Sequence, residues 1–89
     1  MIERDITVTN RLGLHARASA KLVQALQRLQ CEVWLISNGR EVNAKSIMGV
    51  MMLAAGMGSR ITLRADGPDE ATAIDSAAEL FARNFDEGG

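Results

Sequence analysis

The chain has 89 residues and a formal net charge of −1, and 47% of its residues are hydrophobic, enough for one small core. The balanced charge leaves no basic stripe of the kind expected of a nucleic-acid binder. One cysteine and one histidine exclude an internal disulfide, a thiolate zinc site and a His cluster, so we expect no structural metal. We also expect no bound cofactor. No apolar run reaches the roughly 18 residues of a membrane span, and Met1–Asp5 is no signal peptide, which predicts a cytoplasmic protein without membrane insertion.

The first third of the chain changes its hydrophobic period once. Apolar and polar residues alternate over 2–9, which predicts a strand with one solvated face, and Asn10–Gly13 interrupts the alternation. From Ala16 the period becomes helical and predicts an amphipathic helix of about fourteen residues. Its apolar stripe is Ala20, Leu22, Val23, Leu26 and Leu29.

The middle of the chain predicts a β-hairpin followed by a short helix. Residues 31–36 are rich in β-formers, Asn38-Gly39 is a strong two-residue turn signal, and residues 41–44 supply the return strand. Ser46 is placed to cap a helix that runs to about Ala55 and ends at the following glycines.

Strict alternation over Arg60–Asp66 predicts a fourth strand, and Gly67-Pro68-Asp69-Glu70 turns the chain into a third helix. The apolar stripe expected for this helix is Ala71, Ile74, Ala78, Phe81 and Phe85. The order β-α-β-β-α-β-α, without a linker, predicts one α+β domain over residues 1–89, with helices on one face of an antiparallel sheet.

His15 lies in the run Gly13–Arg17, between a glycine turn and the first helix. A lone histidine at a helix start is most often a cap or a surface residue. Here, however, the unpaired first-turn amides form a natural anion site, and Arg17 adds a guanidinium whose planar fork suits phosphate oxygens. The positive end of the helix also disfavours the imidazolium. Together these features predict a nucleophile beside an anion cradle.

The second helix carries more apolar residues than one buried face can use. Val50, Leu53, Ala54 and Met57 share a stripe that can face the core. Contiguous apolar surface that is left exposed usually marks a partner, although a neighbouring loop could cover it instead. The surplus residues are Ile47, Met48, Met51 and Met52.

Three segments together resemble one family. The runs Gly13–Arg17 and Lys45–Met51 and the intervening hairpin Ser37–Gly39 resemble HPr, the histidine-containing phosphocarriers of the phosphoenolpyruvate-dependent phosphotransferase system, over the whole chain. The resemblance implies an open-faced β-sandwich with strand order 1-4-2-3. It also implies that enzyme I phosphorylates His15 on Nδ1 and that an enzyme IIA component receives the group.

The same resemblance assigns further residues. Arg17 matches the arginine that contacts the phosphate, and Ser46 matches the serine modified by the ATP-dependent HPr kinase/phosphorylase. It implies a monomeric carrier that is a substrate of two enzymes and not itself an enzyme. The implied partner surface contains His15, Ala16, Arg17, Ala20, Gln24, Ile47, Met48, Met51 and Met52.

Two positions depart from the family's usual pattern. Ala18 stands where proline is usual, so the fixed φ that pre-organises the first helical turn is absent, although alanine itself favours the helix. Leu12 replaces a small polar residue and removes one hydrogen-bonding group near the imidazole.

Two other functions compete with a sugar-transport carrier. A nitrogen-type regulatory phosphorelay would use the same chemistry, and Gly67–Glu70 and Asn84–Asp86 look somewhat like that branch. A regulatory module that binds a ligand or partner non-covalently would need no phosphohistidine. Acid-labile, alkali-stable phosphate on His15 distinguishes either carrier from the non-covalent module.

Overall fold

The computed structural model describes residues 1–87, and its four strands form one antiparallel sheet in the order β1-β4-β2-β3. The strands are β1 (Ile2–Thr7), β2 (Glu32–Ser37), β3 (Arg40–Asn43) and β4 (Arg60–Asp66). Strand β4 pairs with both β1 and β2, and β3 occupies the edge beyond β2. The expected α+β class and strand order are confirmed.

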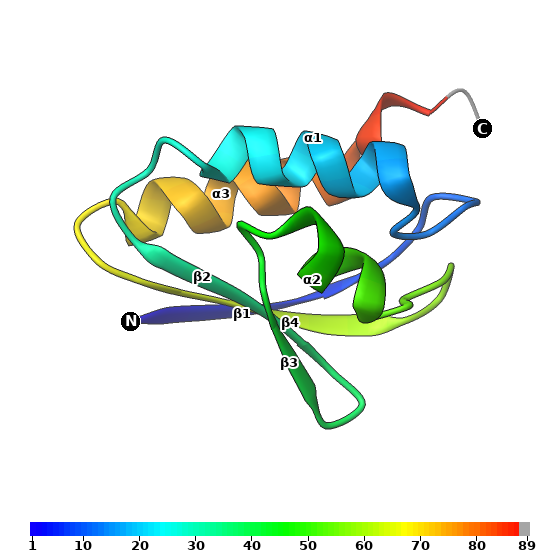
Figure 1. Cartoon of the computed structure of the whole chain (residues 1–89), viewed down its shortest axis with the longest axis horizontal. Helices are drawn as coiled ribbons and strands as arrows, with labels where there is room; N and C mark the ends of the chain where they lie inside the picture. Colours follow the sequence, from blue (N-terminus) through cyan, green and yellow to red (C-terminus); the bar gives the residue numbers. More distant parts are fainter. Residues whose placement is uncertain (88–89) are drawn as a thin grey trace.

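Three helices cover one face of this sheet (Figure 1). They are α1 (Ala16–Leu26), α2 (Ile47–Met52) and α3 (Glu70–Ala82), and a short 3-10 segment, η1 (Asn84–Asp86), follows α3. Helix α1 packs on both α2 and α3, and α3 lies on β1 and β4. No helix within residues 1–87 is long and apolar enough to cross a membrane.

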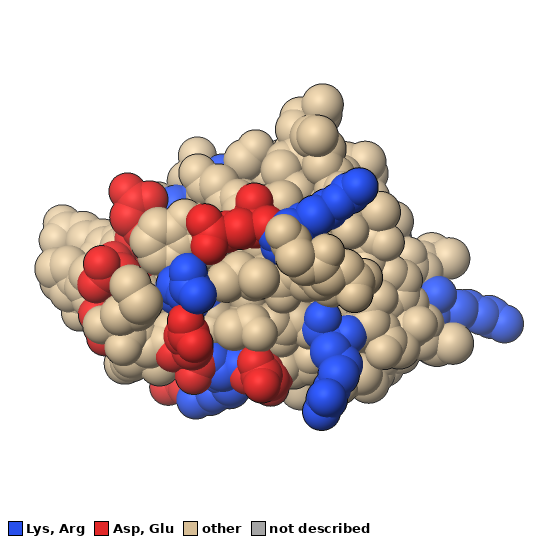
Figure 2. All heavy atoms as spheres, turned by 90° about the horizontal axis from the view of Figure 1, so that it is seen from below, with Lys and Arg blue, Asp and Glu red and all other residues tan. Residues whose placement is uncertain are grey.

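Alternation along the strands separates the core from the open face of the sheet. In β4, Ile61, Leu63 and Ala65 are buried beneath the helices. On the opposite face, Arg64 donates to Glu3 at 2.7 Å and to Glu41 at 3.0 Å. Seen from below Figure 1, acidic and basic side chains mix over the surface (Figure 2). The open face is therefore a solvated, charge-paired surface.

The hairpin turn has the geometry that its sequence predicts. Asn38 and Gly39 both have positive φ, 51° and 77°. A two-residue hairpin turn needs positive φ at both positions so that its twist matches the twist of the flanking strands. The strand that follows is Arg40–Asn43, one residue earlier than expected, and its partner is Glu32–Ser37 rather than 31–36.

Helix α1 is shorter than its periodicity predicts. The helix ends at Leu26, and a tighter turn of the 3-10 type follows. There, Leu29 N–H donates to the carbonyl three residues back, that of Leu26, at 3.1 Å, and not to the carbonyl four residues back as in an α-helix. Leu22, Val23 and Leu26 are buried as expected, whereas Leu29 lies beyond the helix and is only partly buried.

Helix α2 is also shorter than expected, and its predicted core stripe is half wrong. The helix ends at Met52, and Ala54 adopts a left-handed φ of 55°, which turns the following residues off the helical path. Val50 and Leu53 are buried, whereas Ala54 is exposed and Met57 is 66% exposed. Ala55, in the loop after the helix, is buried instead.

Helix α3 buries a face rotated from the predicted stripe. Ala71 is exposed and Ala78 is only partly buried, whereas Ile74 and Phe81 are buried as expected. Phe85 is also buried, but it lies in η1 and not on the helix. The observed core face of α3 is Ala73, Ile74, Ala77, Leu80 and Phe81.

Candidate functional site

The loop that precedes α1 is held against the backbone that follows α2. Leu14 N–H donates to the Ala55 carbonyl at 2.9 Å, and Gly13 N–H closes a turn onto Asn10 O at 3.2 Å. Gly13 has a φ of +64°, and a Cβ placed there would meet the Ala55 carbonyl oxygen and lie 2.7 Å from the Gly56 Cα. Only glycine fits this approach, which fixes where α1 begins.

His15 occupies the N-cap position of α1. Its backbone is extended, with φ −75° and ψ −180°, and its carbonyl accepts the first helical bond, from Ser19 N–H at 2.9 Å. The N–H groups of residues 16–18 precede that bond and have no intrahelical acceptor. His15 caps through its backbone alone, since its side chain makes no capping bond.

The imidazole of His15 is held from the other end of the chain. Its Nε2 lies 2.7 Å from Oε2 of Glu87, which also accepts from Asn10 Nδ2 at 2.8 Å. The Asn10 amide donates in addition to the Gly13 carbonyl at 2.8 Å, and Asn10 is fully buried. One buried amide thus ties the His15 loop to the carboxylate that holds the ring.

The Glu87 carboxyl group is kept ionised. The hydrogen bond from His15 is the main cause that lowers the pKa of Glu87 from its ordinary value of 4.5. Burial opposes it, and the hydrogen bond from Asn10 adds to the lowering. At neutral pH the group that faces the imidazole is therefore a carboxylate.

Glu87 reaches this position because the chain reverses sharply after α3. Asn84, Phe85 and Asp86 have positive φ values of 55°, 53° and 60°. A left-handed conformation costs about 1–2 kcal/mol for a residue such as Phe85, whereas Asn and Asp tolerate it better, so the segment needs specific contacts that hold Phe85 there.

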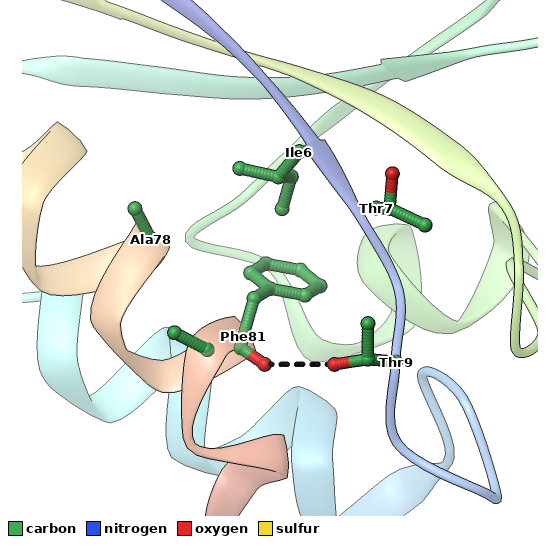
Figure 3. A pocket seen from close by; sticks show the side chains of 6 residues that line it. Ile6, Thr7, Thr9, Ala78 and Phe81 are labelled. Atoms are coloured by element: carbon green, nitrogen blue, oxygen red, sulfur yellow. Dashed lines mark hydrogen bonds between the residues drawn. The ribbon is translucent and has the colours of Figure 1, made fainter.

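These contacts lie on both sides of the reversal. The Phe85 ring is buried and meets Phe81 edge-on, with ring centroids 4.8 Å apart. Lys21 on α1 donates to the Phe85 carbonyl at 2.8 Å. The Thr9 hydroxyl lies 2.5 Å from Asn84 Oδ1 and reaches the Phe81 carbonyl at 3.5 Å, beside a shallow pocket between β1 and α3 (Figure 3). The C-terminal segment is therefore anchored to the loop after β1 and to α1.

Arg17 lies in the first turn of α1, two residues beyond His15, and its side chain is exposed. Within residues 1–87, no carboxylate lies within ion-pair distance of its guanidinium. Among these residues the Arg17 side chain is thus an exposed cation without an ion-pair partner, on the same helical turn that His15 caps.

Ser46 is the N-cap of α2, as expected, and its Oγ accepts from Gly49 N–H at 3.1 Å.

The surplus apolar side chains of α2 are exposed, with Met48 and Met52 the most exposed at 70% and 67%. The alternative that a neighbouring loop covers them is therefore wrong. On α1, Ala16 and Gln24 are exposed and Ala20 is partly exposed. The four exposed apolar residues of α2 are Ile47, Met48, Met51 and Met52.

Sequence reasoning missed two residues of this site, Asn10 and Glu87. Glu87 is 72 positions from His15, and no local period or motif connects them. Asn10 read only as a strand breaker, although a buried amide in a loop needs partners. The sequence also did not predict that Leu12 and Met57 are exposed apolar residues, at 64% and 66% exposure.

Comparisons with known proteins agree with this architecture. The family described as the PTS HPr component phosphorylation site matches residues 2–83. The phosphocarrier protein HPr of Cupriavidus necator is 58% identical over 88 residues, covering 99% of both chains. Phosphocarrier protein HPr of Xylella fastidiosa is 58% identical over 87 residues, covering 98% of both.

Solved structures show the same fold. The crystal structure of HPr-C-His from Thermoanaerobacter tengcongensis has a TM-score of 0.95 and 38% identity, with all of both chains covered. A crystal structure of an HPr dimer from the same organism has a TM-score of 0.78 and 39% identity, covering 98% of this chain and 100% of that one. These matches define a phosphocarrier of the phosphotransferase system. The chain belongs to the HPr family.

Replacing Gly13 with alanine tests how the loop is held. We expect Gly13→Ala to lower stability by about 1–3 kcal/mol, because the new Cβ meets the backbone at Ala55 and the residue is strained at positive φ. Gly56→Ala is the matched control, since a Cβ there meets nothing within 4 Å. Thermal unfolding compares the two, and equal midpoints would show that this contact does not position the loop.

The lowered pKa of Glu87 gives a pH prediction. Because the folded value lies below 4.5, the carboxylate contact with His15 is fully present above that pH and is lost as the pH falls through the lower folded value. A carbon NMR titration of the Glu87 carboxyl should have a midpoint below 4.5, and His15→Ala should raise that midpoint. A wild-type midpoint at or above 4.5 would contradict the contact.

Proposed function

We propose that this HPr-family chain accepts a phosphoryl group from phosphorylated enzyme I on Nδ1 of His15 and passes it to an enzyme IIA component. The observation that carries the proposal is the arrangement at the start of α1: His15 is the N-cap, its ring is held through Nε2, and Arg17 lies on the first turn. Among the described residues, Nε2 alone of the two ring nitrogens has a hydrogen-bond partner.

The transfer follows from the groups at the start of α1. The Nδ1 lone pair attacks phosphorus while the bond to the donor breaks, and charge develops on the equatorial oxygens. The Arg17 guanidinium and the free amides of residues 16–18 can bind those oxygens. The reaction is reversible and leaves the carrier unchanged after two transfers, so the carrier is a substrate of both partner enzymes and no enzyme itself.

The docking surface we propose joins the His15 turn to the exposed face of α2. Enzyme I and enzyme IIA would cover the ring and the neighbouring apolar side chains together. Methionine side chains adapt to differently shaped partners, as a carrier with two partners requires. The proposed surface contains Ala16, Ala20, Gln24, Ile47, Met48, Met51 and Met52.

Ser46 is the proposed regulatory site, modified by an HPr kinase/phosphorylase. A phosphate on this N-cap adds about −1.5 to −2 charges at the rim of the docking surface and is tolerated by the positive end of the helix. Docking of enzyme I would weaken without a change of fold.

The proposed carrier acts as a single domain and as a monomer, which presents the His15 turn and the α2 face to one partner at a time. It needs no cofactor, because the phosphoryl group arrives already activated. Since phosphoenolpyruvate is a product of cytoplasmic metabolism, we propose that the relay runs in the cytoplasm.

Substitution of His15 tests the assignment directly. His15→Ala should abolish labelling by enzyme I and phosphoenolpyruvate, since the nucleophile is gone, and should leave the circular dichroism spectrum unchanged, since the ring is not part of the core. Labelling of wild type and variant is measured with the same enzyme I. A variant that still becomes labelled would refute His15 as the acceptor.

Two charge substitutions in α2 separate docking from folding. Met48→Asp places a carboxylate on a side chain that is 70% exposed, so transfer from enzyme I should slow by about tenfold or more with little loss of thermal stability. Val50→Asp buries a charge at a fully buried position and should unfold the domain. Equal destabilisation by both would show that the α2 face is part of the core.

Substitutions of Ser46 separate capping from regulation. Ser46→Ala removes the bond to Gly49 N–H and should cost about 1 kcal/mol of stability without slowing transfer. Ser46→Asp keeps an acceptor for the cap and adds charge, so transfer from enzyme I should slow, most strongly at low ionic strength. Unchanged transfer in the Asp variant at low salt would leave Ser46 as a cap only.

A further inference from the structure

The hydrogen bond between His15 and Glu87 is short and largely shielded from solvent. Oε2 of Glu87 is 2.7 Å from the imidazole Nε2, and the side chains of His15 and Glu87 are only 25% and 14% exposed. Water therefore has limited access to the contact. The fully buried Asn10 amide, which donates to the same oxygen, leaves the carboxylate little freedom to swing away.

The neighbouring acidic residue is oriented elsewhere. Asp86 pairs with Arg83 at 3.1 Å and lies 3.7 Å from Lys21. The left-handed reversal at residues 84–86 thus sends one carboxylate toward α1 and α3 and delivers the next one to the imidazole. The contact is the product of a specific chain path and not of a general excess of acidic residues.

The contact determines where the ring proton lies. A carboxylate accepts hydrogen bonds and does not donate them, so the Nε2 of His15 must carry a proton to bond to Glu87. In the neutral ring the other nitrogen, Nδ1, then holds the lone pair. This is the nitrogen that the proposed transfer uses.

We propose that Glu87 is a positioning residue of the carrier, which holds His15 as the Nε2–H tautomer and stabilises the positive charge that the ring gains when Nδ1 takes up the phosphoryl group. This inference rests on the proposed function of His15.

The step balances without another base. The Nδ1 lone pair forms the bond to phosphorus, and the leaving atom of the donor keeps the electron pair of the bond that breaks. No proton leaves His15, because the Nε2 proton remains in its hydrogen bond to Glu87. The ring becomes a cation beside a carboxylate, which favours the phosphorylated carrier. In the return step the acceptor takes the phosphoryl group and the ring becomes neutral again.

Three variants separate the two parts of this role. Glu87→Ala removes both the acceptor and the charge, whereas Glu87→Gln keeps an acceptor for Nε2–H and removes only the charge. Asp86→Asn is the matched control, because it removes one negative charge at the adjacent position, and asparagine tolerates the left-handed backbone there. All are made in the full chain, and thermal unfolding verifies that each is folded.

The first measurement is the tautomer of His15 by long-range ¹H–¹⁵N NMR of the unphosphorylated protein above neutral pH. Wild type, Asp86→Asn and Glu87→Gln should show Nε2–H, and Glu87→Ala should show a mixture. The second is the phosphorylation equilibrium with enzyme I. It should shift toward the unphosphorylated carrier by about three- to tenfold in both Glu87 variants, since Glu87→Ala deletes a charge-assisted hydrogen bond and Glu87→Gln leaves only a weaker, neutral one, and it should not shift in Asp86→Asn.

The outcomes distinguish this inference from the function on which it rests. If wild type cannot be phosphorylated at all, the proposed function fails, while the tautomer measurement still decides whether Glu87 orients the ring. If wild type is phosphorylated and Glu87→Ala has the same tautomer and the same equilibrium, the positioning role is refuted. An equal shift in Asp86→Asn would also refute it, since any nearby charge would then suffice.

Discussion

The site depends on the close approach of two loop backbones, Gly13 against Ala55. This contact joins the start of α1 to the chain that leaves α2, and it leaves no space for a side chain on Gly13. Because of it, the His15 turn and helix α2 are held in a fixed relation to each other. A chain with the same helices but a looser loop would present a histidine and an apolar patch without a fixed relation between them.

Much of this arrangement could be predicted from local pattern. The alternation of Arg60–Asp66, the Asn38-Gly39 turn and the Ser46 cap each depend on neighbouring residues, and each is found as expected. The errors fall where the backbone leaves its regular path. Ala54 and Asn84–Asp86 adopt left-handed conformations without glycine, which no helical period can anticipate.

The Glu87 contact could not be predicted for a different reason. It joins residues 72 positions apart, and it exists only because Phe85 is buried against Phe81 and the reversal is anchored by Thr9 and Lys21. Such a contact is determined by packing of the whole domain. The same packing that completes the core at the end of α3 therefore also places a carboxylate at the imidazole, so the proposed chemistry of His15 depends on the stability of this segment.

Membership in the HPr family explains the fold and the general role, and the Glu87 contact leads us to propose a separate role for each nitrogen of the His15 ring. The most direct test is the position of the phosphoryl group in the phosphorylated protein, read from ³¹P and ¹⁵N couplings of that ring. We predict phosphorus bonded to Nδ1 and a proton on Nε2. Phosphorus on Nε2, or on any residue other than His15, would contradict both the proposed transfer and the role of Glu87.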